Sequence, residues 1–434
     1  MRSRGARRLV GLSAALALGA VSVGLTSCAT TESSSETLRV WWYEGDDSAQ
    51  GRAWTEALEA FRAENPDVEV EFELKTWDQM MKSGQMILNS DEAPDLLEYP
   101  KGNATAGAVA KAGLLTNLTD VAAERGWSER LPDSLLSVGR YDERGLMGTG
   151  DLYGVPTYAE YVAVFYNKDL LAERGLEPPA TIEEFEQQLA AFTADGITPL
   201  ALGAADAPIV HLVYQLALSR ADQQWVRDFQ FFEGDTDFHD DAWSFAAETV
   251  ADWKAKGYIS ADATGIDGDA AAEAFKSGAS PYFVTGTWFS GDFDASIESF
   301  DWGTFPIPGS GLAQGSGGNV WVVPAASEHK DLAYDFIDRL LDEESQTAVA
   351  NYGGVAVAAN LDEVTNPVGQ LVADDLAAIL ENDGLGFYPD WPVPGYYDVW
   401  LAQSQNLVNG TVTPTEYLDN LAAFYERGRT ELGL

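Results

Sequence analysis

The sequence contains a single cysteine, Cys28, in 434 residues, and three histidines, His211, His239 and His329. One cysteine excludes a disulfide within the chain, and its place near the N-terminus argues against a catalytic thiol. Basic residues are also few, because 26 Lys and Arg stand against 69 Asp and Glu, for a formal charge of -43. Phosphate binding needs clustered Lys and Arg, so nucleic acid is not expected as a partner.

Motifs of the common catalytic centres are missing as well. The chain has no Gly-x-Ser-x-Gly elbow, no His-Glu-x-x-His and no Walker loop. The scattered histidines predict no histidine-based metal site, and the acidic turn at 235–241 lacks the glycine and the spacing of a calcium loop. We therefore expect no catalytic residues, no metal and no cofactor. A secreted glycosidase stays open as an alternative. Such an enzyme uses two carboxylates, and among 69 Asp and Glu the sequence cannot show whether a catalytic pair is present.

The N-terminus has the pattern of an export signal. Arginines at 2, 4, 7 and 8 precede an apolar run from Leu9 to Leu25, which is shorter and richer in small residues than a membrane span. The ending Leu25-Thr26-Ser27-Cys28 resembles a bacterial lipobox, which implies that Cys28 carries a lipid. We expect residues 1–27 to be a lipoprotein signal peptide and 28–36 a flexible tether, with the chain anchored to the outer face of the cell membrane. The export route, Sec or twin-arginine, stays open.

The remainder of the chain alternates short apolar runs with amphipathic stretches. Leu38–Tyr43, the strictly alternating Val68–Leu74 and Asp95–Tyr99 are predicted strands, and Ala49–Asn65 and Trp77–Asn89 are predicted helices. Strand, helix, strand, helix, strand indicates an α/β fold with a parallel sheet. A chain of this length exceeds one ordinary core and predicts two lobes.

Several motifs in order then resemble a known family. The run begins with Gly154-Val155-Pro156, an apolar strand, Asn167-Lys168-Asp169-Leu170-Leu171 and Gly175-Leu176-Glu177-Pro178-Pro179. It continues with Ala274-Phe275-Lys276-Ser277-Gly278, Gly286-Thr287-Trp288 and Phe305-Pro306-Ile307-Pro308. This order and spacing resemble the family 1 extracellular solute-binding proteins, which include the maltose-binding type.

The resemblance implies a two-lobed periplasmic-binding-protein-like fold of class II, with a hinge and a mostly parallel sheet flanked by helices in each lobe. We expect residues 37–155 and 304–358 in the N-terminal lobe, and 156–303 and 359–434 in the C-terminal lobe. It also implies that a carbohydrate binds between the lobes, and that the closed, monomeric protein delivers it to the permease of an ABC importer. A polyamine-binding protein of the same architecture stays open, because acidic and aromatic sites also suit cationic amines.

Candidate ligand-binding residues follow from chemistry and from the resemblance. A sugar needs aromatic platforms for its C–H faces and polar groups for its hydroxyls. Residues beyond the carboxyl ends of strands, or where the crossing chain passes between the lobes, are candidates on that ground: Tyr43, Glu44, Lys101, Asn103 and Asn319. Trp391 and Tyr396 are candidates because they lie in the rigid, aromatic loop Phe387–Tyr397. The resemblance adds four positions that match sugar-binding residues of the family, and one where the family often places a polar ligand: Tyr99, Glu160, Trp288, Tyr397 and Asp206.

Overall fold

The computed structural model describes residues 36–389 and 391–434. The expected signal peptide at residues 1–27, Cys28 and all of the expected tether except residue 36 lie outside the described residues. The first elements are β1 (Glu36–Trp42), α1 (Ala49–Glu64), β2 (Val68–Leu74), α2 (Trp77–Leu88), β3 (Leu96–Tyr99), α3 (Ala108–Lys111), α4 (Thr119–Glu124), α5 (Trp127–Arg130), α6 (Asp133–Leu136), β4 (Arg140–Tyr141), β5 (Asp151–Leu152) and β6 (Val155–Pro156).

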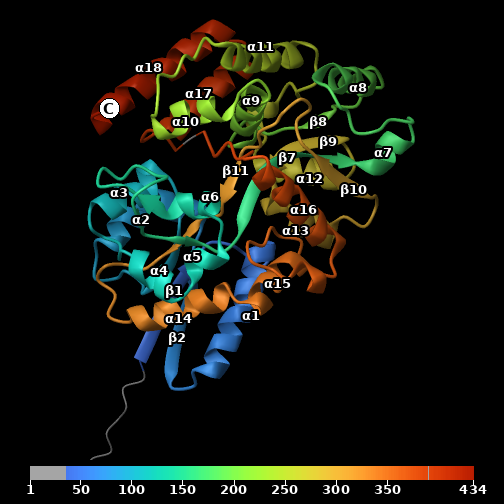
Figure 1. Cartoon of the computed structure of the whole chain (residues 1–434). Coiled ribbons are helices and arrows are strands. Elements are labelled where there is room, and N and C mark those ends of the chain that lie inside the picture. Colours follow the sequence, from blue (N-terminus) through green and yellow to red (C-terminus); the bar gives the residue numbers. More distant parts are fainter. Residues whose placement is uncertain (1–35, 390) are drawn as a thin grey trace, which may run out of the picture. The chain divides into compact units, whose positions relative to one another are not determined.

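The chain continues with strands and helices that match the α/β pattern expected from the sequence (Figure 1). They are β7 (Ala159–Asn167), α7 (Lys168–Ala172), α8 (Ile182–Ala194), β8 (Leu200–Ala201), α9 (Pro208–Leu218), α10 (Gln223–Phe231), α11 (Asp241–Ala255), α12 (Gly268–Lys276), β9 (Tyr282–Gly286), α13 (Ser290–Ser296), β10 (Trp302–Phe305), β11 (Gly315–Gly317), β12 (Val320–Val322), α14 (Lys330–Leu340), α15 (Glu343–Asn351), α16 (Pro367–Glu381), α17 (Tyr396–Val408) and α18 (Pro414–Leu432). Within the described part of the chain, no helix has both the length and the apolar character needed to cross a bilayer.

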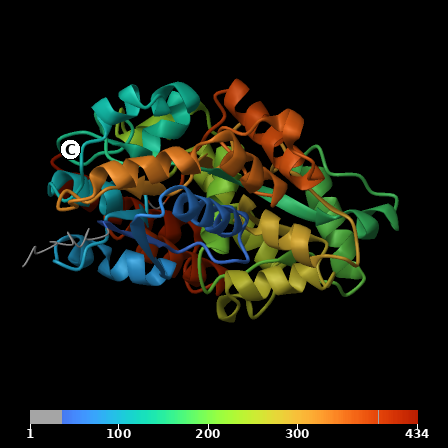
Figure 2. The same cartoon turned by 90° about the horizontal axis from the view of Figure 1, so that it is seen from below.

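The first sheet has the strand order β2-β1-β3-β12-β6. Strand β1 runs parallel to β2 and β3, and β12 runs antiparallel to β3 and β6. Helix α1 lies beside α14 and α15 (Figure 2). The alternating side chains of β1 bury Trp42 in a core with Trp54 and Trp321, whose ring centroids are 5.0 Å apart. The helices and strands expected in this region form within a few residues of their predicted ends.

The second sheet has the order β10-β7-β9-β8, and β11 also pairs with β7. Only β8 and β9 pair in parallel here, whereas β7 pairs antiparallel with β9, β10 and β11. The sheet of this lobe is therefore mostly antiparallel, whereas we expected mostly parallel strands. The direction of a strand depends on how the chain connects it to its neighbours in space, which the local sequence pattern does not show. Helices α9, α11, α17 and α18 lie side by side and bury a large aromatic core (Figure 1).

The chain passes between the two sheets at neighbouring places. Residues 157–158 lead from β6 to β7, and residues 318–319 lead back from β11 to β12. The Gly318 N–H donates to the Tyr158 carbonyl at 2.7 Å, and the Ala159 N–H donates to the Val355 carbonyl at 2.9 Å. These crossings lie against one another, which is the arrangement that a hinge requires.

One expected boundary differs from this path. We expected the chain to return to the N-terminal lobe at residue 304. Thr304 instead pairs with Phe165 of β7, and Ser316 pairs with Glu160. The change of sheet comes only at residues 318–319, because the Pro- and Gly-rich segment before it turns back along β7.

Candidate functional site

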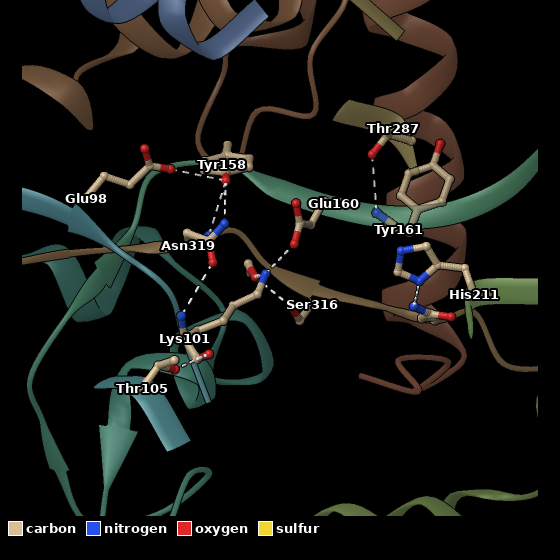
Figure 3. Close-up of polar contacts among 12 residues, drawn as sticks. Glu98, Lys101, Thr105, Tyr158, Glu160, Tyr161, His211, Thr287, Ser316 and Asn319 are labelled. Carbon is tan, nitrogen blue, oxygen red and sulfur yellow. Dashed lines mark hydrogen bonds and ion pairs between the residues drawn. The ribbon is translucent and has the colours of Figure 1, made fainter. Parts of the chain in front are cut away.

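Several candidate residues meet where the chain passes between the sheets. Lys101 follows the end of β3, and Glu160 lies at the start of β7. Asn319 comes from the crossing between β11 and β12. Figure 3 shows these side chains turned toward one another, with Tyr158 and Glu98 beside them.

Lys101 is the centre of the cluster. Its Nζ lies 2.5 Å from Oε1 of Glu160 and donates to the Gly317 carbonyl at 2.6 Å. Lys101 is 5% exposed and Glu160 is 8% exposed. The ammonium group also lies 5.0 Å from the ring centroid of Tyr388 and 5.2 Å from that of Trp391. A buried cation thus joins a carboxylate to two aromatic rings.

Tyr158 links the two chain crossings by hydrogen bonds. Its hydroxyl donates to Oε1 of Glu98 at 3.4 Å and accepts from Nδ2 and the backbone N–H of Asn319, each at 3.3 Å. Oδ1 of Asn319 accepts from the Lys101 N–H at 3.4 Å. Asn319 therefore holds Lys101 and Tyr158 in one network.

Two further carboxylates lie at the ends of β1 and β3. Glu98 is fully buried, and its Oε2 accepts from the Tyr43 N–H at 3.1 Å. Burial, with the nearby Glu44 as a smaller cause, raises the pKa of Glu98 well above its ordinary range. Burial likewise raises the pKa of Glu44 to about 7. Both groups hold their proton more strongly than they would in water.

Aromatic side chains form a second part of the site. Gly286 ends β9 and lets the ring of Trp288 lie close, since a Cβ there would be 1.8 Å from Cζ3 of the indole. The Trp288 ring centroid is 5.4 Å from that of His211 and 6.4 Å from that of Tyr388. Gly102, with φ of +115°, similarly leaves room for Trp391. Glycines thus admit the aromatic rings next to the Lys101 cluster.

Not every candidate faces this cluster. Tyr396, which we expected to contact the ligand, is instead fully buried among α17 and α18, with its ring centroid 5.3 Å from that of Trp400. Helix α17 begins at Tyr396 and turns its first side chain into the core. Tyr397, the next residue, is partly buried.

Three more candidates have structural partners. Asn103 donates from Nδ2 to the Pro392 carbonyl at 3.0 Å and accepts from the Met147 N–H at 2.7 Å, so it fastens the aromatic loop. Asp206 accepts from the Gly268 N–H at 3.1 Å at the start of α12. The ring of Tyr99 packs against Gly84 of α2. Each of these side chains has a contact within the fold, although Oδ1 of Asp206 is buried without a hydrogen-bond partner among the described residues.

Other residues of the site were not among the candidates. Glu98 was detectable, because a carboxylate inside the buried strand Leu96–Tyr99 needs a partner. Tyr388, the Gly317 carbonyl and His211 have no such local signal. Burial lowers the pKa of His211 to about 4, so it is neutral near pH 7 and shares a hydrogen bond of 2.5 Å with Gln314.

The raised pKa of Glu44 predicts a pH-dependent effect of its replacement. Between about pH 4.5 and 7 the folded protein holds a proton on Glu44 that the unfolded chain has released, so this contribution to stability falls as the pH rises. Glu44→Gln should leave the free energy of unfolding nearly unchanged at pH 4.5 and raise it by about 3 kcal/mol at pH 8. Urea titrations at both pH values measure this difference. An effect of the same size at both would contradict the assigned burial of the carboxyl.

Metal binding receives no support from the described residues, which contain no group of three or more His, Cys, Asp or Glu side chains placed to hold an ion. The site instead combines hydrogen-bond donors, acceptors and aromatic faces.

Comparisons with known proteins show the family and the fold of the chain. A model of the bacterial extracellular solute-binding protein family matches residues 45–347. The diacetylchitobiose binding protein DasA of Streptomyces coelicolor is 26% identical over 74% of this chain and 72% of its own length. The galactooligosaccharide-binding protein of Bacillus subtilis is 30% identical over 41% of this chain and 39% of its own length.

Solved structures show the same two-lobed fold. A chitin oligosaccharide binding protein has a TM-score of 0.75 at 21% identity, over 91% of this chain and 99% of its own. The binding protein RafE, solved in complex with raffinose, has a TM-score of 0.71 at 20% identity, over 91% and 99%. The chain therefore belongs to the bacterial extracellular solute-binding protein family, as the order of its motifs predicted.

Proposed function

We propose that this chain is the lipid-anchored, extracytoplasmic solute-binding subunit of an ABC importer, and that it captures a mono- or oligosaccharide. Cys28 would carry the lipid, and the monomeric protein would deliver its ligand to the transmembrane permease subunits. The role is binding and delivery, without turnover of the ligand. Family membership and the sugar-binding relatives support this proposal.

The observation that carries the carbohydrate assignment is the Lys101–Glu160 pair beneath Tyr388 and Trp391. Sugar hydroxyls both donate and accept hydrogen bonds, so a site with an ammonium group, a carboxylate and an amide can satisfy them in both directions. The aromatic rings suit the apolar C–H faces of a sugar. A polyamine offers only donors and positive charge, and a buried lysine at the centre disfavours it.

The mechanism that we propose is closure driven by the ligand. The first-sheet side contributes Lys101 and Asn319, and the second-sheet side contributes Glu160 and Trp288. A ligand that contacts both sides stabilises the arrangement in which they meet and shifts the population toward it. We propose that the lobes that close are the two expected from the sequence, except that the chain returns to the N-terminal lobe at residues 318–319 rather than at residue 304.

Calorimetric titration of the protein without its first 28 residues tests the function. The panel contains N-acetylglucosamine and galactose oligosaccharides, maltose, raffinose and spermidine. We expect saturable binding of at least one carbohydrate and none of spermidine. Glu160→Gln should weaken carbohydrate binding by about 10- to 100-fold, because it removes a charged hydrogen-bonding group from the site.

Glu129→Gln, on an exposed face of α5, is the matched control and should bind as the wild type does. If the protein bound spermidine and no sugar, the carbohydrate assignment would be wrong and the ligand would be a cationic amine. Turnover of a chromogenic glycoside that is lost in Glu160→Gln would instead make the protein an enzyme.

A further inference from the structure

Helix α2 presents an aromatic ring to solvent at its first residue. Trp77 is 45% exposed, although tryptophan is usually well covered in folded proteins. A capping box holds this end of the helix, since the Thr76 N–H donates to Gln79 Oε1 at 3.0 Å and the Gln79 N–H donates to Thr76 Oγ1 at 3.2 Å. The backbone that carries the ring is therefore well defined.

Two more exposed apolar side chains stand close to Trp77 in the sequence. Leu74, three residues earlier, is 52% exposed, and Met81, one turn later on the same helix, is 40% exposed. Residues four apart on a helix share a face, so Met81 lies next to Trp77. Single exposed apolar residues are ordinary, but a neighbouring group of them indicates a binding surface.

This surface adjoins the Lys101 cluster through Tyr43. The ring centroids of Trp77 and Tyr43 are 5.4 Å apart in an edge-to-face contact. The backbone N–H of Tyr43 donates to Glu98, which also accepts from Tyr158. Further along α2, Gly84 packs on the ring of Tyr99. Trp77 is thus one aromatic ring away from the carboxylates of the site.

Tyr43 also contributes a buried hydroxyl to this region. Burial and the nearby charge of Glu98 raise the pKa of its hydroxyl, followed by smaller contributions from Tyr158 and Glu44. The hydroxyl oxygen is buried and has no hydrogen-bond partner among the described residues. A buried polar atom without a partner is unfavourable, and a ligand hydroxyl placed there would satisfy it.

We propose that Trp77 forms an outer subsite that stacks on a terminal sugar residue of an oligosaccharide whose inner residue occupies the Lys101–Glu160 site, with Tyr43 between them. This inference rests on the proposed function and narrows it. The ligand is an oligosaccharide long enough to reach α2, rather than a monosaccharide. An indole face offers the same apolar contact to many sugars, so the subsite selects for length more than for identity.

A ladder of ligand lengths tests the subsite. Affinities are measured by calorimetry for N-acetylglucosamine and its β-1,4 oligomers up to the pentamer, and for a galactose series of the same lengths. We expect Trp77→Ala to weaken binding of the longer members by about tenfold and that of the monosaccharide by less than twofold. Trp77→Tyr keeps an aromatic face and should retain most of the affinity for the longer members.

Met86→Ala is the matched control, because Met86 is 71% exposed on the same helix and has no place in the proposed subsite. It should leave every affinity unchanged. A loss of the same factor at all lengths, or no loss at any length, would overturn the subsite.

The ladder also separates this inference from the function on which it rests. Binding of short and long sugars with equal affinity by the wild type would reject the outer subsite and leave carbohydrate binding intact. Binding of no sugar at any length would reject both.

Discussion

Replacement of Lys101 by methionine is expected to lower the free energy of unfolding by about 3–5 kcal/mol, because Glu160 would remain buried without its counter-charge. The Gly317 carbonyl would lose the same donor. Urea denaturation with linear extrapolation measures the change. The variant should also lose measurable carbohydrate binding, since the ammonium group is the centre of the proposed site.

A double variant distinguishes the missing charge from lost packing. Lys101→Met with Glu160→Gln leaves no unpaired charge and should recover a large part of the stability, although not the binding. Lys168→Met, at an exposed position at the start of α7, is the control for the loss of a lysine and should change stability by less than about 0.5 kcal/mol. A Lys101→Met protein as stable as the wild type would show that Glu160 is solvated.

Replacement of Trp321 by alanine should be similarly destabilising, at about 3–5 kcal/mol. Trp321 is fully buried on β12, and its ring lies 5.0 Å from that of Trp54 and 6.0 Å from that of Trp42. Its indole N–H donates to Thr157 Oγ1 at 3.1 Å, at the chain crossing beside the site. The variant leaves a cavity in the first core and removes a bond that holds the hinge segment.

Trp77→Ala is the matched comparison, because it removes the same side chain from an exposed position. It should reduce stability by less than about 1 kcal/mol, while Trp321→Ala shifts the urea midpoint strongly. Equal losses for the two variants would contradict the burial that the structure assigns to them.

Secondary structure could be predicted from the sequence where it depends on residues close together in the chain. The strict alternation of Val68–Leu74 predicted β2 with both ends correct. Alternation with a period of two indicates a strand, because successive side chains of a strand point to opposite faces. Thr181 stands three residues before Glu184, which is the pattern of a helix start, and it accepts from the Glu184 N–H at the start of α8. These features depend on residues a few positions apart, so they can be read without the fold.

For the candidate site, the sequence could suggest single residues but not which of them meet. Lys101, Glu160 and Asn319 were chosen one by one, and the fold joins them through contacts between residues 59 and 218 positions apart. Tyr396 and Tyr388 lie in the same aromatic segment, yet one is in the core of α17 and α18 and the other faces Lys101. Nothing local separates two tyrosines eight residues apart.

By itself, the sequence determined the α/β character, the export-type N-terminus, the low count of histidine and cysteine, and membership of a solute-binding family. Each of these follows from composition, short-range periodicity or motif order. The tertiary structure decided which aromatic rings meet the Lys101–Glu160 pair, where the chain returns between the sheets, and that Trp77 remains exposed beside Tyr43. Those outcomes depend on how distant segments pack, and packing is settled only when both sheets and their crossings are in place.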